Sequence, residues 1–306
     1  MRLGFNLPQI GHAATPDNLV RAAERAEALG YDSVWTTDRL LFPVAPMTPY
    51  GGSPDGSLPE PYKIALDPLA SLTWAAAYTK RIGLGTSVLD MPYYNPVLFA
   101  RQITTLDVLS GGRAIVGLGQ GWSEDEHIAT GGSMKHRGAR ADEFLKVLHA
   151  IWKDDPAEFQ GKFFTLPKSI IQPKPVQKPH PPVYLAAFSP TALKRIATLG
   201  DGWLPVGVPI DGMRQMFDGI KAMAKEAGRN PSDLKLVVRA NILVSDTAMG
   251  EGRWIFSGSK DEIKADIKAT KELGAHEVHF DPTFSRDGES IDGFLKSMEQ
   301  VRELAG

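Results

Sequence analysis

Two apolar segments in the first half of the chain each run into residues that could bind a ligand. Ile82–Val88 is followed by a loop that carries Asp90 and Asn95, and Ala114–Leu118 leads into the glycine-rich stretch Gly117–Trp122. Glycines let a ligand approach the backbone closely, and carboxylate and amide groups can hydrogen-bond to it. Loops at the C-terminal ends of parallel strands form the active sites of (β/α)8 barrels. The stretch therefore indicates a site and an architecture that would hold it.

A third apolar segment, Ser33–Thr36, places a carboxylate, Asp38, just after its end. At the end of a barrel strand this side chain would point into the barrel mouth, and Asp38 is our candidate catalytic residue. The alternative interpretation is an ion pair with Arg39 or with a group of a neighbouring loop.

The glycine-rich stretch is not a nucleotide-binding fingerprint. The third glycine of G-x-G-x-x-G would fall at Trp122, and no Gly-Lys-Ser/Thr follows, so both dinucleotide and P-loop motifs are excluded. Alternating glycines still allow close approach of a ligand to the backbone. The alternative is a flexible turn after a strand.

A basic cluster stands at the start of the helix predicted over Arg137–Trp152. Its members are Lys135, His136, Arg137 and Arg140. Cations at this end oppose the helix dipole, so another group must compensate for them. One interpretation pairs them with the three consecutive acids at positions 124–126. The other makes part of the cluster face an anionic ligand.

A second helix N-terminus offers anion-binding groups. Ser189 and Thr191 lie between the predicted strand Val183–Ala186 and the helix Thr191–Leu199, while Pro190 removes one amide donor. Free amides at a helix N-terminus bind phosphate. A plain Ser N-cap is compatible with that role.

Other chemistries find little support. His276 and His279 are three residues apart on a strand and so point to opposite faces, and no His, Asp or Glu cluster has zinc spacing. No G-x-S-x-G nucleophile motif is present. The side chains that could form an apolar substrate wall, although such residues are more often core, are Trp122, Trp254, Phe256 and Tyr50.

Composition restricts partners and location. The net charge is −2 and cysteine is absent. Such a balance provides no field to attract nucleic acid or acidic membranes, and no apolar run is long enough to span a membrane. The N-terminus does not resemble a signal peptide. We expect a cytoplasmic protein that binds neither nucleic acid nor membrane.

Strand and helix signals alternate along the chain. The predicted strands are Leu3–Leu7, Ser33–Thr36, Ile82–Val88, Ala114–Leu118, Val183–Ala186, Gly202–Pro205, Leu236–Val244 and Glu277–Phe280. The predicted helices cover 16–29, 68–79, 96–109, 137–152, 191–199, 213–227, 261–273 and 291–304. Eight such units predict an α/β fold, a single (β/α)8 TIM-barrel domain over residues 1–306, with a doubly wound open sheet as the alternative.

Two segments exceed ordinary connections. Arg39–Asp67 is a long Pro/Gly-rich loop with several large apolar residues, which we interpret as a lid over the mouth, supplying Phe42, Met47 or Tyr50 to a substrate pocket. The segment 155–182 is an insertion that begins with a hairpin over 155–166. A plain surface loop is the alternative for the first segment.

The chain resembles the bacterial-luciferase-like oxidoreductases, and within them the branch that uses the deazaflavin coenzyme F420. The matching blocks, in order, are RLGFNLPQ, EALGYDSVWTTDRL, RIGLGTSVLDMPYYNPVLFARQITTLDVLSGGRAIVGLGQGW, HRGARADEF, PPVYLAAFSPTALKRIATLGDGWLP and LGAHEVHFD. The resemblance implies a luciferase-like barrel, dimeric, that binds a flavin or deazaflavin at its C-terminal face. It further implies a cis peptide at Ser87–Val88 that backs the cofactor ring.

The resemblance also implies which residues bind the cofactor. They are Asp38, Ser87, Val88, Asn95, Gly119, Gln120, Gly121, Trp122, His136, Arg137, Ala187, Phe188, Ser189 and Thr191. Two positions depart from the family: Arg39 stands where many members have His, and Phe188 where many have Gly. Because Arg39 replaces this His, the proton-transfer role that the His has in some members does not carry over to this chain.

These inferences predict an oxidoreductase that transfers a hydride between F420 and a small apolar organic substrate, acting as a homodimer without a metal. Two alternatives remain open. The first is an FMN-dependent monooxygenase of the same fold. The second is a non-catalytic flavin-binding protein.

Overall fold

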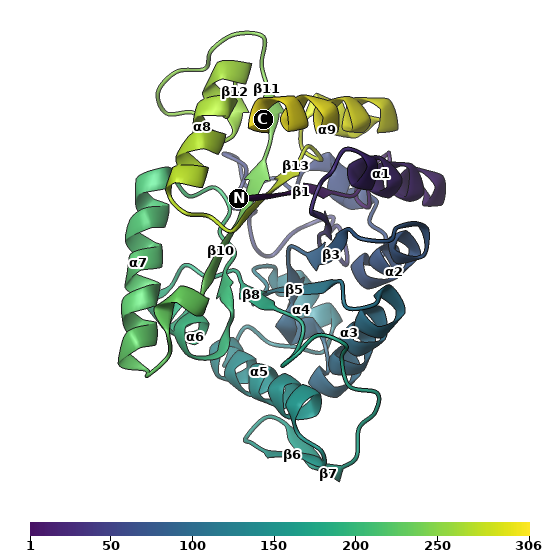
Figure 1. Ribbon diagram of the computed structural model, residues 1–306, viewed down its shortest axis with the longest axis vertical. Coiled ribbons are helices and arrows are strands. Elements are labelled where there is room, and N and C mark those ends of the chain that lie inside the picture. Colours follow the sequence, from purple (N-terminus) through teal and green to yellow (C-terminus); the bar gives the residue numbers. More distant parts are fainter.

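Eight parallel strands pair with one another in chain order and close into a barrel, as the computed structural model of residues 1–306 shows (Figure 1). Pairing of β3 with β5 and of β13 with β1 completes the ring. The barrel strands are β1 (Arg2–Asn6), β2 (Ser33–Thr36), β3 (Gly83–Thr86), β5 (Ala114–Gly119), β8 (Val183–Leu185), β9 (Gly202–Trp203), β10 (Lys235–Asn241) and β13 (Glu277–Asp281). The predicted TIM barrel is confirmed.

A helix follows each barrel strand and lies on the outside of the ring (Figure 1). These helices are α1 (Pro16–Ala28), α2 (Pro68–Tyr78), α3 (Pro96–Ser110), α5 (Arg137–Lys153), α6 (Pro190–Leu199), α7 (Ile210–Glu226), α8 (Lys260–Glu272) and α9 (Ile291–Ala305). Several begin with a proline in the first turn and a side-chain cap, such as Asp67 before α2 and Asn95 before α3. Those caps satisfy amides that the helix leaves free.

Shorter elements fill the loops. They are β4 (Leu89–Asp90), α4 (Glu124–Ala129), the hairpin β6 (Ala157–Gln160) and β7 (Thr165–Ser169), the pair β11 (Leu243–Val244) and β12 (Ser257–Gly258), and the 3-10 turns η1 (Glu60–Lys63), η2 (Met91–Tyr93), η3 (Pro231–Asp233) and η4 (Arg286–Glu289). The hairpin predicted over 155–166 is present. The short helix α4 was not predicted.

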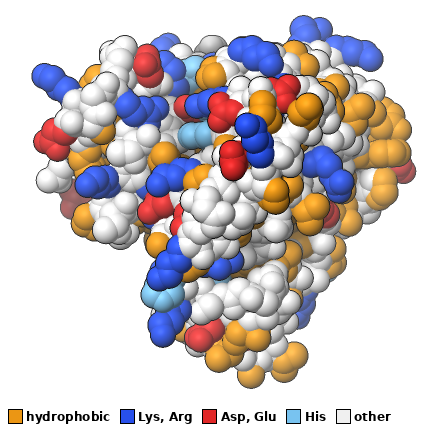
Figure 2. All heavy atoms as spheres, turned by 90° about the horizontal axis from the view of Figure 1, so that it is seen from below, with side chains coloured by type: hydrophobic (Ala, Val, Ile, Leu, Met, Phe, Trp, Pro, Cys, Tyr) orange, Lys and Arg blue, Asp and Glu red, His pale blue; other side chains and the backbone are white.

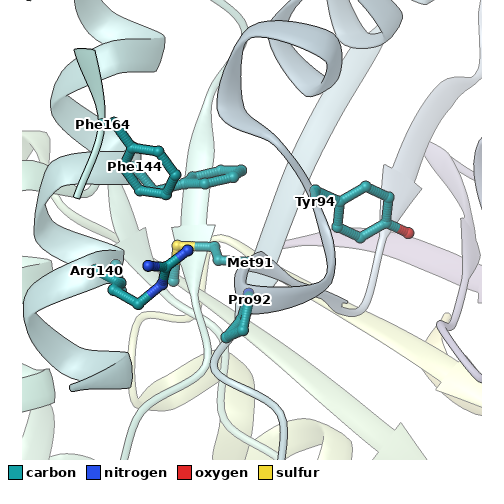
Figure 3. Close-up of a pocket in the computed structure, with 7 residues that line it drawn as sticks. Met91, Pro92, Tyr94, Arg140, Phe144 and Phe164 are labelled. Atoms are coloured by element: carbon teal, nitrogen blue, oxygen red, sulfur yellow. The ribbon is translucent and has the colours of Figure 1, made fainter. Parts of the chain in front are cut away.

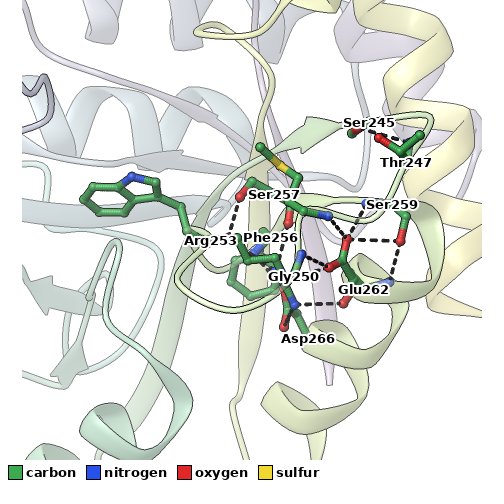
Figure 4. Close-up of polar contacts among 11 residues, drawn as sticks. Ser245, Thr247, Gly250, Arg253, Phe256, Ser257, Ser259, Glu262 and Asp266 are labelled. Atoms are coloured by element: carbon green, nitrogen blue, oxygen red, sulfur yellow. Dashed lines mark hydrogen bonds and ion pairs between the residues drawn. The ribbon is translucent and has the colours of Figure 1, made fainter.

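The chain between β11 and β12 is tied to the first turns of α8 (Figure 4). Arg253 pairs with Asp266 at 2.6 Å, and Glu262 accepts hydrogen bonds from the amides of Met249 and Gly250. Glu262 also forms a capping box with Ser259. The carboxylates of Glu262 and Asp266 are thus bound within the protein, so this network has a structural role.

Trp35 fills the interior of the barrel. Its ring stacks on His279 with centroids 4.3 Å apart, and its indole N–H donates to Glu277 at 2.9 Å. A Cβ at Gly85 of the neighbouring strand β3 would clash with the indole ring, and one at Gly4 would lie 2.6 Å from Nε1. The large indole ring therefore requires glycines on the strands beside it.

No helix of this fold combines the length and apolarity that crossing a membrane requires. In the view from below, acidic and basic side chains are interspersed over the surface, in keeping with the small net charge (Figure 2).

The variant Gly85→Ala should lower the free energy of unfolding by about 2 kcal/mol or more, because the added methyl group overpacks the ring of Trp35. Gly219→Ala is the matched control. Gly219 lies in α7 with open space around it, and its replacement should stabilise the protein by about 0.5–1 kcal/mol. Urea unfolding measures both, and equal effects of the two substitutions would contradict this packing argument.

Candidate functional site

A cavity of about 230 Å³ opens at the C-terminal ends of the barrel strands. Its wall combines carboxylates, two arginines and a series of aromatic and aliphatic side chains. The lining residues are Thr37, Asp38, Arg39, Tyr50, Tyr62, Ser87, Val88, Asp90, Trp122, Ala186, Leu204, Val206, Arg239, Asn241 and Phe284. Most of them stand one to four residues beyond a strand, as expected of a barrel active site.

The peptide bond between Ser87 and Val88 is cis, which confirms the prediction made from the resemblance. The carbonyl oxygen of Ser87 accepts hydrogen bonds from Arg239 Nη1 at 2.6 Å and from Thr37 Oγ1 at 3.1 Å. The hydroxyl of Ser87 lies 2.9 Å from Nε2 of His279. Burial lowers the pKa of His279 well below its usual range, so the ring is neutral. His279, interpreted from sequence as structural, thus contacts a residue of the cavity wall.

Asp38 points into the cavity, as predicted. Its Oδ2 accepts a hydrogen bond from the hydroxyl of Tyr94 at 2.9 Å, and its Oδ1 is buried without a hydrogen-bond partner. The alternative ion pair with Arg39 does not form. Burial raises the pKa of Asp38 to about 6, because the charged carboxylate is poorly solvated there.

Asp90 is a second carboxylate of the cavity that sequence reasoning noted but did not assign to the site. Its Oδ1 accepts a hydrogen bond from the amide of Gly121 at 2.8 Å. Burial, and next the charge of Asp38, raise the pKa of Asp90 to about 7. The two carboxyl groups therefore titrate as a coupled pair in the neutral range. The signal available in the sequence was an acid directly after the bulge that ends β3.

Arg39 pairs with Glu126 of α4, and both side chains are buried. Its Nε donates to Glu126 Oε1 at 2.6 Å, and the guanidinium lies over the rings of Trp122 and Tyr62, at 5.1 and 5.2 Å from their centroids. The hydroxyl of Tyr93 donates to Glu126 at 3.1 Å. Of the three acids that one interpretation pairs with the basic cluster, Glu126 holds Arg39 instead, and Asp125 accepts a hydrogen bond from the amide of Met47.

Arg39, Tyr50 and Tyr62 of the segment 39–67 line the cavity, and hydrogen bonds join the segment to α4, while its role as a lid stays a prediction. The amides of Leu40 and Met47 donate to Glu126 and Asp125, at 2.8 and 3.0 Å. Tyr50 packs on Trp122 with ring centroids 5.3 Å apart. Of the side chains predicted to supply a pocket, Tyr50 lines the cavity, whereas Met47 is 57% exposed.

Of the other residues predicted to form the substrate wall, some line the cavity and some lie outside it. Phe42 lies against Lys63 and outside the cavity. Trp122 lines the cavity, Phe256 is fully buried in the core, and Trp254 is 65% exposed outside it. Of these four predicted aromatic wall residues and Phe42, the cavity is lined by Trp122 and Tyr50.

The glycine-rich stretch is required by packing within the protein. A Cβ at Gly119 would meet the carboxylate of Asp90, and one at Gly121 would lie 2.7 Å from the hydroxyl of Tyr93. Gly121 also has a φ of 67°, which favours glycine. Close contact with neighbouring side chains therefore requires these glycines, and contact of this stretch with a cofactor stays a prediction.

The basic cluster has several separate roles. Arg137 donates to the carbonyl of Gly121 at 2.7 Å, so it fixes the glycine-rich stretch from the far side. His136 is exposed and precedes α5 with a φ of 63°. Arg140 lies over the ring of Phe164 and faces a small apolar cavity of about 10 Å³ beside Phe144 (Figure 3). Arg137 thus lies beside the glycine-rich stretch, His136 lies near the ring of Phe163, and Arg140 supports the core.

The N-terminus of α6 presents groups that could hold a phosphate. Ser189 makes no capping bond, its hydroxyl lies 3.4 Å from that of Thr191, and Phe188 is 54% exposed. Arg195 of α6 donates to the carbonyl of Gly138, at 2.8 Å, and so brings α6 beside the start of α5. The two anion-binding features predicted from sequence are therefore neighbours.

The three remaining residues predicted to bind the cofactor lie in different surroundings. Gln120 has a buried side-chain amide nitrogen without a partner. Ala187 is buried and accepts a hydrogen bond from Trp203. Asn95 is exposed and its side chain caps α3 through the amides of Val97 and Leu98, outside the cavity. No three His, Asp or Glu side chains converge on a point that could hold a metal ion.

Residues 1–250 match the sequence profile of the family described as luciferase-like monooxygenase. The chain belongs to this luciferase-like family. A relative from Mycobacterium tuberculosis is 36% identical over 211 residues, which cover 68% of this chain and 74% of the relative. The F420-dependent glucose-6-phosphate dehydrogenase of Amycolatopsis mediterranei is 35% identical over 193 residues, 62% of this chain and 53% of its own. The FMNH(2)-dependent dimethylsulfone monooxygenase of Pseudomonas putida is 31% identical over 204 residues, which cover 65% of this chain and 54% of the relative.

Solved luciferase-like structures share the fold along the whole chain. The monooxygenase RslO1 from Streptomyces bottropensis has a TM-score of 0.79 at 21% identity, with 99% of this chain and 98% of that chain covered. The coenzyme F420-dependent tetrahydromethanopterin reductase from Methanopyrus kandleri has a TM-score of 0.76 at 19% identity, with 99% and 97% covered. The family thus includes members that depend on F420 and members that depend on FMN.

The variant Asp38→Asn should stabilise this luciferase-like protein at high pH only. The pKa of Asp38 is raised in the folded state, so the unfolded chain ionises first as pH rises. The carboxyl group therefore costs the folded protein stability increasingly between about pH 4 and pH 6, and to the full extent above pH 6. We expect the free energy of unfolding to rise by about 1–3 kcal/mol at pH 8 and to be unchanged at pH 4.

Urea unfolding across this pH range measures the effect. Asp218→Asn, at an exposed position of α7, is the control and should change stability by less than about 0.5 kcal/mol at every pH. A stabilisation by Asp38→Asn that does not vary with pH would count against the buried-acid assignment.

Proposed function

We propose that this luciferase-like protein is an F420-dependent oxidoreductase that transfers a hydride between the deazaflavin and a small organic substrate. One observation carries the proposal: a buried carboxyl group, Asp38, faces a covered cavity with one oxygen unpartnered, beside the Ser87–Val88 bulge. The 35% identical relative named for F420 dependence supports the choice of cofactor.

The chain's residues fit a deazaflavin with a long anionic tail. The hydroxyls of Ser189 and Thr191 and the free amides of α6 suit a phosphate group. His136 and Arg137 lie at the start of the neighbouring helix, where their charge suits the carboxylates of the tail. The unpartnered amide nitrogen of Gln120 supplies one more donor near these groups.

The deazaflavin, when bound, supplies a ring carbon that accepts or gives a hydride. Asp38 Oδ1 takes up or returns the proton of the substrate's oxygen, because its raised pKa lies close to neutral pH. Burial is the main cause of that raised pKa, and the charge of Asp67 adds to it. The segment 39–67 excludes water from the cavity, which strengthens the electrostatic interactions inside it.

An FMN-dependent monooxygenase is the second candidate. The 31% identical relative named as FMNH(2)-dependent favours it, and the α6 N-terminus suits the single phosphate of FMN as well. A non-catalytic flavin-binding protein has less support. Such a protein has no use for Asp38 and Asp90, whose burial opposes folding at neutral pH.

The homodimer implied by the resemblance stays a proposal, and the surface that suits it lies on α2 and α3. These helices are in contact and carry exposed apolar side chains: Trp74, Tyr78, Val97, Leu98, Val108 and Leu109. Hydrophobic side chains gather on the right-hand edge of Figure 2, the side on which Figure 1 shows α2 and α3. Exposed apolar patches of this kind mark protein interfaces.

Fluorescence titration of the protein with F420 and with FMN tests the cofactor assignment. We expect F420 to bind at least about tenfold more tightly, since only its tail reaches the basic residues of α5. The variant Thr191→Asp places a negative charge beside the phosphate and should weaken F420 binding by about tenfold or more.

The matched control is Thr198→Asp, the same change at the opposite end of α6, which should leave F420 affinity unchanged. Micromolar binding of FMN together with undetectable binding of F420 would overturn the proposal in favour of the monooxygenase.

A further inference from the structure

The cavity contains two positive charges, and each is neutralised by a buried acid. Arg239 at the end of β10 pairs with Asp281 of β13, at 2.5 Å from Nη2 to Oδ2. Arg39 pairs with Glu126, as described above. Neither guanidinium is therefore a free cation that an anionic substrate could use.

The hydrogen-bonding capacity of Arg239 is largely spent within the protein. Its Nη1 donates to the Ser87 carbonyl at 2.6 Å, and its Nε donates to Asn241 Oδ1 at 3.1 Å. Its Nη2 donates to Asp281, so each nitrogen of the guanidinium donates one hydrogen bond within the protein. One N–H on Nη1 and one on Nη2 remain, but the charge of the guanidinium is already neutralised by Asp281.

Two further carboxyl groups lack a cation altogether. Asp38 and Asp90 form no ion pair, and Asp38 Oδ1 lies buried and unpartnered in the cavity wall. When both ionise, four carboxylates face two guanidinium groups around one cavity. An anion that entered would meet net repulsion and would leave water without a counter-ion, which is costly in a buried site.

The rest of the wall suits uncharged groups. Trp122, Tyr50 and Phe284 contribute rings, and Leu204 and Val206 contribute aliphatic surface. Asn241 provides a neutral amide at the edge of the cavity. Such a wall binds apolar groups and orients them through few polar contacts.

We infer that the substrate of this site is a neutral molecule with a hydroxyl or carbonyl group between apolar substituents, and that carboxylates and phosphate esters are rejected by charge. This inference rests on the proposed function. In the oxidative direction the C–H bond of the alcohol breaks and its hydride reduces the deazaflavin. The O–H proton passes to Asp38 Oδ1 and a carbonyl product forms; carbonyl reduction is the reverse.

Isothermal titration with a matched pair of probes tests the charge rule without turnover. Acetophenone and phenylglyoxylate share a ring and a ketone, and differ by a methyl group in place of a carboxylate. The protein without cofactor and the protein with bound F420 should both bind acetophenone at least about tenfold more tightly than phenylglyoxylate. Turnover of 1-phenylethanol against mandelate, the corresponding alcohols, should show the same order.

Two variants should reverse the preference in part. Asp281→Asn leaves Arg239 without its counter-ion, and Asn241→Lys adds an unpaired cation at an exposed wall position without breaking a buried pair. Each should strengthen phenylglyoxylate binding by about tenfold relative to acetophenone binding, and Asp281→Asn, which lies outside the cavity lining, should leave acetophenone binding within about threefold. Asp292→Asn removes the partner of Arg21 on the surface and should change neither affinity.

Equal or tighter binding of phenylglyoxylate to the unaltered protein would overturn the inference, as would failure of both probes to bind. An unchanged preference in Asn241→Lys would also count against it. Absence of F420 binding with the charge preference intact would overturn the proposed function alone. F420 binding with no charge preference would overturn the substrate class alone.

Discussion

The mouth of this barrel depends on the buried ion pair between Arg39 and Glu126. It joins the first residue after Asp38 to the helix that follows the glycine-rich stretch, and two aromatic rings cover its guanidinium. Loss of one partner of such a pair leaves an unpaired buried charge, which typically costs about 3–5 kcal/mol. The pair therefore holds the segment 39–67 in place, and with it the wall that Tyr50 and Tyr62 contribute.

The burial of the acids at the mouth sets their chemistry. Asp38 and Asp90 are poorly solvated, so their pKa values rise to about 6 and about 7. Groups that titrate near neutral pH transfer protons most effectively.

Sequence reasoning predicted what depends on local pattern. The eight strands, their helices, the insertion hairpin and the place of Asp38 all follow from periodicity, capping residues and position after a strand. The pairing of Arg39 with Glu126 could not be predicted, because 87 residues separate the partners and three acids compete at 124–126. The glycines of 117–121 and the position of Asn95 were interpreted as ligand contacts, although neighbouring loops require the glycines and Asn95 caps a helix.

The neighbourhood of the cis peptide shows the same limit. The family resemblance predicted the bond at Ser87–Val88, but two of its partners, Arg239 of β10 and His279 of β13, lie more than 150 residues later in the chain. Only barrel closure brings Arg239 and His279 beside it. Their contribution to the site follows from topology and has no local signal in the sequence.

The pH dependence of deazaflavin reduction by substrate, in the unaltered protein and in Asp38→Asn, tests the central claim most directly. The account predicts that kcat/KM rises with pH through an apparent pKa near 6 and then levels off, as Asp38 becomes the base. In Asp38→Asn this limb should vanish and the rate should fall by about 10²–10⁴-fold. A variant that keeps the rate and the limb of the unaltered protein would contradict the account.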